Sequence, residues 1–185
     1  MIGSLLTSCV SLFLNSCGEP GKERALPYTL SVRRDKNDSM TLTRADDAAA
    51  CFIGGLSCSQ AVCAAFAEDF EIDRDTALKL SCGLGGGMGH TGNTCGAVTG
   101  ALMVIGMKYG RTKVDDLEAK EKTYELVNEF ITEFLRRNHS LNCTDLIGHN
   151  LSDPKELAIA RENDLFHTKC TRFVRDAGEI LEKIL

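Results

Sequence analysis

Nine cysteines are the residues of this chain that most clearly point to chemistry. Their number is odd in a sequence of 185 residues, and no two are spaced as C-x-x-C. A chain of this length with 43% hydrophobic residues can fold on its own core and does not need a disulfide scaffold. We therefore interpret the thiols as metal ligands, reactive groups or small core residues. The nine are Cys9, Cys17, Cys51, Cys58, Cys63, Cys82, Cys95, Cys143 and Cys170.

Four of these cysteines occupy positions that favour a shared site. Cys58 and Cys95 follow turns at predicted helix starts, and Cys143 precedes a short helical turn. Free N–H groups and the positive end of the helix dipole stabilise a thiolate at a helix start, so we expect lowered thiol pKa values there. Cys170 lies on the apolar face of the last predicted helix.

The alternative interpretation is that these thiols only fill the core, because free cysteine behaves as a small hydrophobe. Cys63 lies well around its helix from Cys58, so the two cannot face one site. Cys51 and Cys82 indicate nothing beyond packing. Core filling could explain any one of these cysteines. It is a weaker explanation for three cysteines at helix starts and one facing inward when all four are taken together.

A glycine-rich tract over residues 83–92 cannot be regular helix. Its letters Gly87-x-Gly89-x-x-Gly92 match the dinucleotide fingerprint, but no strand is predicted before them, so we expect a chance match and no nucleotide. A nest of backbone N–H groups in this tract, beside Cys95, could stabilise a thiolate, a sulfide or a bound anion.

The histidines are weaker candidates than the cysteines for residues of the site. His90, within the glycine tract, is either a ligand or proton donor or an exposed loop residue. His167 lies one helical turn before Cys170, close enough to share a site. His139 and His149 are near in sequence, but the spacings match no zinc finger or ribbon.

The four candidate cysteines and the histidines lie on or between segments that are predicted to be helices. Few prolines and many helix-forming residues, with no alternating segment that requires a strand, predict an all-α compact helical bundle with a Gly-rich loop before a central helix. Gly96 and Gly100 on that central helix would let another helix pack tightly against it. The predicted helices span residues 41–52, 58–70, 73–80, 95–109, 115–137, a turn at 144–147, and 166–185.

Residues 1–39 differ from the rest of the chain because they lack its helical pattern. Residues 14–17 resemble a lipobox in which Cys17 would be lipidated in an exported lipoprotein, but no basic residue precedes the apolar run. We favour a disordered extension, or one upstream of a true start at Met40, followed by a single helical domain over residues 40–185 in the cytoplasm. No segment predicts a membrane span, and a net charge of -5 without basic clusters argues against nucleic acid as a partner.

The cysteine-containing blocks together resemble a known family. The chain resembles the C-GCAxxG-C-C family of redox-active proteins over about residues 41–184. The resemblance implies that the four family cysteines are Cys58, Cys95, Cys143 and Cys170. Thr94 stands where the family name has Gly, and Cys95-Gly96-Ala97 permutes its Cys-Ala. The blocks that carry the resemblance are residues 54–62, 85–89, 94–102 and 142–148, followed by Cys170.

The resemblance implies a redox or iron–sulfur role, because the family is similar to the iron–sulfur part of split-Soret cytochromes. Our leading hypothesis is that the four cysteines bind an iron–sulfur cluster or comparable metal for electron transfer with a partner protein. No C-x-x-C-H is present, so no covalent c-type haem is expected. One alternative is a metal-free thiol oxidoreductase, with Cys58 or Cys95 as the attacking thiol. Another is a structural zinc site in a helical interaction module, and Gly-rich helix faces leave room for a homodimer.

Overall fold

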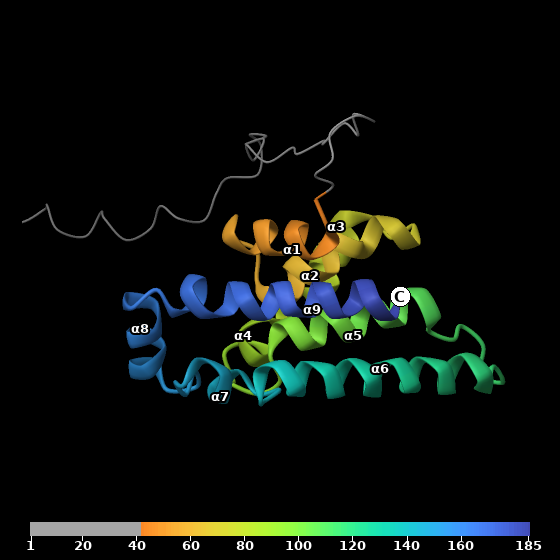
Figure 1. Ribbon diagram of the computed structural model, residues 1–185. Helices are drawn as coiled ribbons and strands as arrows, with labels where there is room; N and C mark the ends of the chain where they lie inside the picture. Colours follow the sequence, from red (N-terminus) through yellow and green to blue (C-terminus); the bar gives the residue numbers. More distant parts are fainter. Residues whose placement is uncertain (1–41) are drawn as a thin grey trace, which may run out of the picture. The chain divides into compact units, whose positions relative to one another are not determined.

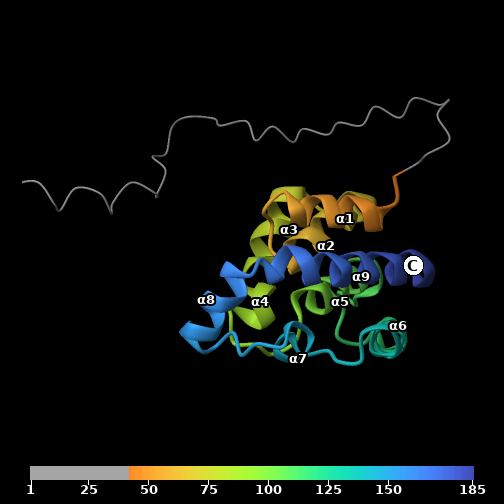
Figure 2. The same cartoon turned by 60° about the vertical axis from the view of Figure 1, so that its left-hand side comes forward.

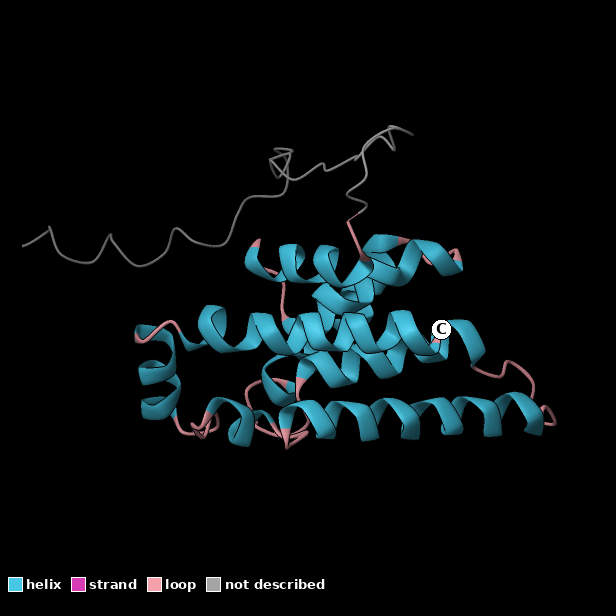
Figure 3. Ribbon diagram, viewed as in Figure 1, coloured by secondary structure: helices cyan, strands magenta, loops and turns pink. Residues whose placement is uncertain are grey.

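The part of the chain that the computed structural model describes, residues 42–185, is built from helices and turns (Figures 1 and 3). Its only bridge between extended residues is the isolated antiparallel pair Thr94 and Asn142. The predicted all-α class is confirmed. The helices are α1 (Arg44–Ile53), α2 (Cys58–Phe66), α3 (Arg74–Ser81), α4 (Gly85–Met88), α5 (Gly96–Tyr109), α6 (Leu117–Asn138), α7 (Cys143–Ile147), α8 (Pro154–Glu162) and α9 (Thr171–Ile184).

Side-chain caps start the first three helices. Thr43 and Asp46 form a capping box at α1, and Ser57 and Gln60 form another at α2. Asp73 caps α3, because its side chain accepts a hydrogen bond from the N–H of Thr76. These caps satisfy N–H groups that would otherwise lack a partner. α2 and α3 begin within one residue of the predicted starts, whereas α1 begins at Arg44, three residues after its predicted start.

Tight contacts between small residues join the helices into a bundle. α1 packs on α9 and α2, α2 packs on α5, and α6 packs against α5 and α9 (Figures 1 and 2). A Cβ atom added at Gly100 of α5 would lie 2.9 Å from the backbone oxygen of Ser59 in α2. The predicted close approach at Gly96 and Gly100 is therefore present, and it brings the central helix against the helix that carries Cys58.

The glycine tract contains a left-handed turn. The five residues Gly86–His90 all have φ between 62° and 68°, although Met88 and His90 are not glycine. Left-handed backbone costs about 1–2 kcal/mol at each non-glycine residue, so the surrounding contacts must hold this turn in place. The tract follows α3 and a 3₁₀ turn at Cys82–Leu84, and thus lacks the strand that a dinucleotide site requires.

Two features of the C-terminal third differ from the sequence prediction. α8 is absent from that prediction, because its residues show little apolar periodicity, yet Pro154 at the first turn and the Asp153 cap begin a helix there. The last helix begins with a π-helical turn at Phe166–Cys170, and regular α9 follows it.

The described helices, within residues 42–185, belong to one compact unit. Within residues 42–185, no helix combines the length and the apolar character needed to cross a bilayer. The expectations for residues 1–39, including lipidation of Cys17, and the proposed start at Met40 lie outside the described residues.

Candidate thiolate site

Four cysteines from four separate segments meet in the interior of the bundle. Cys58 is the first residue of α2, Cys95 is the N-cap of α5, Cys143 is the first residue of α7, and Cys170 ends the π-helical turn. Each is at most 7% exposed. The thiols are close enough for the Cys58 and Cys170 side chains to hydrogen bond and for the charges of Cys95 and Cys143 to act on Cys58. All four are free thiols.

Backbone pairing brings Cys95 and Cys143 together. The N–H of Cys95 donates to the carbonyl of Leu141 at 2.8 Å, and the N–H of Cys143 donates to the carbonyl of Asn93 at 2.7 Å. The bridge between Thr94 and Asn142 lies between these two bonds. The start of α5 and the start of α7 are thus held side by side by main-chain hydrogen bonds.

Two glycines provide the room for this convergence. A Cβ atom at Gly87 would lie 2.7 Å from the Cβ of Cys143, and one at Gly96 would lie 2.9 Å from the Cβ of Cys58. Real Cβ atoms do not approach so closely, so each glycine allows a backbone to lie directly against a site cysteine. The glycine tract acts here through close approach of the chain.

The π-helical turn brings the fourth cysteine to the other three. Lys169 donates from its Nζ to the carbonyl of Ile147 at 2.7 Å, which ties the turn to the end of α7. Gly148 ends α7 in the left-handed conformation, with φ of 82°. Cys170 and Cys143 are therefore positioned by two segments that are bound directly to each other.

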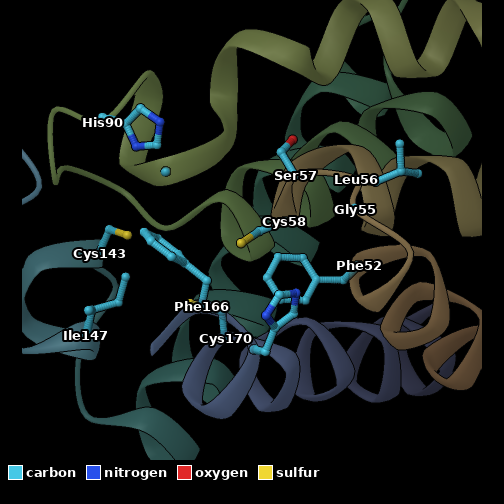
Figure 4. A pocket seen from close by; sticks show the side chains of 12 residues that line it. Phe52, Gly55, Leu56, Ser57, Cys58, His90, Cys143, Ile147, Phe166 and Cys170 are labelled. Atoms are coloured by element: carbon cyan, nitrogen blue, oxygen red, sulfur yellow. The ribbon is translucent and has the colours of Figure 1, made fainter. Parts of the chain in front are cut away.

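A cavity of about 220 Å³ opens beside the thiols (Figure 4). Figure 4 shows Cys58 and Cys143 on opposite sides of the cavity, with the ring of Phe166 between them in this view. Three site cysteines line the cavity, whereas Cys95 is buried without being part of the lining. The lining residues are Phe52, Gly55, Leu56, Ser57, Cys58, Gly86, His90, Cys143, Ile147, Phe166, His167 and Cys170.

The thiols at the three helix starts have raised pKa values, so the prediction of lowered values there is wrong. Burial raises the pKa of Cys95 to about 11, although the N–H groups of Ala97 and Val98 act in the opposite direction. Burial also raises the pKa of Cys143, and the charges of Cys95 and Cys170 add to the effect. The local contribution of the helix start is present, but loss of hydration outweighs it.

Cys58 and Cys170 behave as a pair. Their hydrogen bond, followed by burial, raises the pKa of Cys58 well above its ordinary value. The same hydrogen bond lowers the pKa of Cys170, and the charge of Lys169 lowers it further. Of this pair, Cys170 is therefore the thiol that loses its proton first, with the Cys58 S–H donating to its sulfur. Cys58 and Cys95, predicted as attacking thiols, both have raised pKa values and are less suited to attack than Cys170.

The remaining cysteines lie apart from the site. Cys63 is buried on another face of α2, as expected. Cys51 is half-buried, and its sulfur accepts a hydrogen bond from Arg74 at 3.3 Å. Cys82 is exposed in the 3₁₀ turn, so the packing interpretation of this residue is wrong.

Two of the four histidines lie at the cavity. His90 and His167 are part of its lining, whereas His139 and His149 are not. The short sequence distance between His167 and Cys170 predicted that they share a site, and both residues line the cavity. The apolar walls made by Phe52, Phe166 and Ile147 have no signal in the sequence beyond hydrophobicity, because aromatic and aliphatic residues are common in any core.

The donor set fits a thiolate-bound cluster. Four soft thiols are the ligand count of the common iron–sulfur clusters, and the lining has no carboxylate or lysine that would compete for the metal. A cavity of about 220 Å³ is also much larger than the ~10–15 Å³ that one water requires. Among residues 42–185, no three Cys, His, Asp or Glu side chains are already spaced for a single metal ion. In a four-iron cluster each thiolate binds a different iron, so the four sulfurs stand farther apart than they would around one ion.

Comparison with known proteins assigns the chain to a family. Residues 56–184 match the family described as "Putative redox-active protein (C_GCAxxG_C_C)", and the chain belongs to it. The match contains all four site cysteines and both cavity histidines. No curated protein and no solved structure matches the chain.

Proposed function

We propose that this member of the redox-active C_GCAxxG_C_C family uses Cys58, Cys95, Cys143 and Cys170 to bind an iron–sulfur cluster, or a comparable thiolate-bound metal, for electron transfer. The observation that carries the proposal is the meeting of four buried thiols from four distant segments beside one cavity. Single buried cysteines are common in protein cores, but four that converge in this way need a further cause.

The residues around the thiols supply what such a group requires. A bound cluster would accept and release single electrons while its ligands stay in place. The N–H groups of Ala97 and Val98 favour a thiolate on Cys95, and Lys169 favours one on Cys170. The apolar walls limit the access of water, which protects a thiolate-bound centre from solvent.

Binding to metal requires the thiols to lose their protons. Cys58, Cys95 and Cys143 have raised pKa values in the metal-free chain, so they are protonated at neutral pH. A positive metal centre offsets both the lost hydration and the repulsion between neighbouring thiolates. Loading should therefore release protons and become tighter as the pH rises from 6 to 8.

The test is metal analysis of the full chain purified without oxygen. Iron, sulfide and zinc are measured per chain for the wild type and for Cys58→Ser, Cys95→Ser, Cys143→Ser and Cys170→Ser. We expect iron and sulfide in the wild type and a large loss in each of the four variants. Cys63→Ser and Cys82→Ser, which change one buried and one exposed thiol outside the site, should retain the wild-type content.

Two results would contradict the cluster. A colourless wild-type protein without iron or sulfide would exclude it under these conditions. Zinc alone, held by the same four residues and lost to a chelator with unfolding, would replace it with a structural metal site.

A second candidate is a metal-free thiol oxidoreductase, and the Cys58–Cys170 pair favours it. The lowered pKa of Cys170 and its hydrogen bond to Cys58 place a nucleophilic sulfur beside a second thiol. Oxidation of this pair by a small disulfide would form one S–S bond in the chain and release two substrate thiols. Thiol counts that fall by two on oxidation, and do not fall in Cys170→Ser, would support this function over the first.

A further inference from the structure

The cavity beside the thiols has an apolar inner end and a polar mouth. Phe52, Ile147 and the three lining thiols are at most 7% exposed. At the mouth, the side chain of His167 is 56% exposed, and His90 is exposed as well. The lining contains no carboxylate, lysine or arginine side chain. A charged ligand would lose its hydration here without gaining an ionic partner, so the cavity favours an uncharged and mainly apolar molecule.

Aromatic rings form much of the cavity wall (Figure 4). Phe52 and His167 pack against each other with ring centroids 6.4 Å apart and planes tilted by 56°, and Phe166 lines the same space. Such rings attract a further ring in an offset-stacked or edge-to-face arrangement. An apolar cavity of ~150 Å³ holds benzene. The cavity of about 220 Å³ present here therefore has room for a planar molecule of one or two fused rings.

One ring nitrogen at the mouth can bind a polar group of such a molecule. The Nδ1 atom of His167 is 2.5 Å from the carboxylate of Asp164. A carboxylate only accepts hydrogen bonds, so Nδ1 carries the hydrogen. Nε2 of the neutral ring then has a lone pair to which no donor among residues 42–185 is bonded. The Ser57 hydroxyl, also in the lining, is already bonded to the Ser59 hydroxyl at 3.3 Å and to a backbone N–H at 3.4 Å. A ligand hydroxyl that donates to Nε2 is therefore the group that complements this mouth.

We infer that this cavity binds a small aromatic alcohol, whose one or two rings pack against Phe52 and Phe166 and whose hydroxyl donates to Nε2 of His167. The ligand then lies beside three of the site thiols. Because Cys95 is not part of the lining, the cavity is not the space enclosed by all four thiols but lies next to it. The inference therefore goes beyond the proposed function, and it holds with or without a bound metal.

The test is the binding of 2-naphthol to the full chain, followed by the fluorescence anisotropy of this probe. 2-Naphthol neither alkylates nor oxidises thiols, and the chain has no tryptophan whose emission would overlap with that of the probe. We expect saturable binding of one molecule per chain, both in the metal-free protein and after anaerobic loading with iron. Naphthalene, which has the rings without the hydroxyl, is the matched ligand, and its affinity is measured by displacement of 2-naphthol.

Two variants test whether the probe occupies this cavity. His167→Phe keeps a ring and removes the acceptor, so 2-naphthol should bind about 3- to 10-fold more weakly while the affinity of naphthalene stays the same. A residue with a merely structural role would change both affinities alike. Because His167 is largely exposed, this variant should fold as the wild type does. Leu56→Phe adds volume to the lining and should weaken the binding of both molecules by at least about 10-fold.

Leu146→Phe is the matched control. Leu146 is half-buried like Leu56 but does not line the cavity, so both affinities should stay unchanged. The absence of saturable binding to the wild type would overturn the inference. So would equal weakening of both molecules in His167→Phe, or weakening of 2-naphthol in His90→Phe in its place. Loss of binding once iron is bound would also overturn it. Absence of iron and sulfide would contradict the proposed cluster and leave this measurement intact.

Discussion

The helix α2 carries two buried cysteines in two different environments. Cys58, at its start, faces three other thiols and the cavity. Cys63, on another face, donates its S–H to the carbonyl of Gly100 at 3.5 Å and contacts the Met103 sulfur at 3.8 Å. Cys63 belongs to a small apolar cluster with Ala67 and Ala77, and no other cysteine takes part.

The comparison shows which property identifies the site. Both cysteines are buried and both have raised pKa values, so neither burial nor a shifted pKa distinguishes them. The difference lies in their neighbours, since Cys58 shares its surroundings with thiols from distant segments. The meeting of these thiols depends on the close backbone approach at Gly87 and Gly96. Substitutions at these two glycines should therefore disturb the surroundings of Cys58 and leave those of Cys63 unchanged.

Gly87→Ala should give the largest effect. The added Cβ would lie 2.7 Å from the Cβ of Cys143 and 2.9 Å from the backbone nitrogen of Asn93, in left-handed backbone. We expect unfolding in urea to show a loss of about 2–5 kcal/mol, from overpacking together with backbone strain.

Gly89→Ala is the matched control for that variant. Gly89 has nearly the same φ, 68° against 67°, but its Cβ would meet only the Gly83 oxygen at 4.0 Å. It should lose only about 1–2 kcal/mol from strain. Equal losses in Gly87→Ala and Gly89→Ala would show that the contact with Cys143 does not matter.

Gly96→Ala and Gly106→Ala test the same idea within one helix, α5. A Cβ at Gly96 would lie 2.9 Å from the Cβ of Cys58, so we expect a loss of about 1–3 kcal/mol in the free energy of unfolding. At Gly106 nothing lies within 4 Å, and alanine should stabilise the helix by about 0.5–1 kcal/mol. Thermal unfolding midpoints that move in the same direction for both variants would contradict this prediction.

Cys63→Ala gives the smallest effect, which depends on pH. Burial raises the Cys63 pKa to about 12 from the ordinary 9.0, so the unfolded chain loses this proton first and stability falls as the pH rises above 9. Between pH 9 and 10 this thiol should account for about 1 kcal/mol of the decrease in the metal-free wild type. Urea unfolding of Cys63→Ala at both values should show a correspondingly shallower decrease, and an identical decrease would refute the assignment.

Much of the local structure could be predicted from the residues. Ser57 and Gln60 begin α2 through a capping box, so the amino-acid order alone places Cys58 at a helix start. Gly110 and Gly148 end α5 and α7 at the predicted positions. α8 could not be predicted in this way, because its helix-start signal, Asp153-Pro154, precedes a segment without a clear apolar stripe.

The sequence by itself determined most of the helices and the positions of three cysteines at helix starts, because helix caps are local properties. Only the tertiary structure decided the direction of the thiol pKa values. A helix start favours a thiolate through its own N–H groups, but burial of Cys95 and Cys143 depends on segments that lie far apart in the chain. The same holds for the cavity, whose lining residues come from α1, α2, the glycine tract, α7 and the π-helical turn.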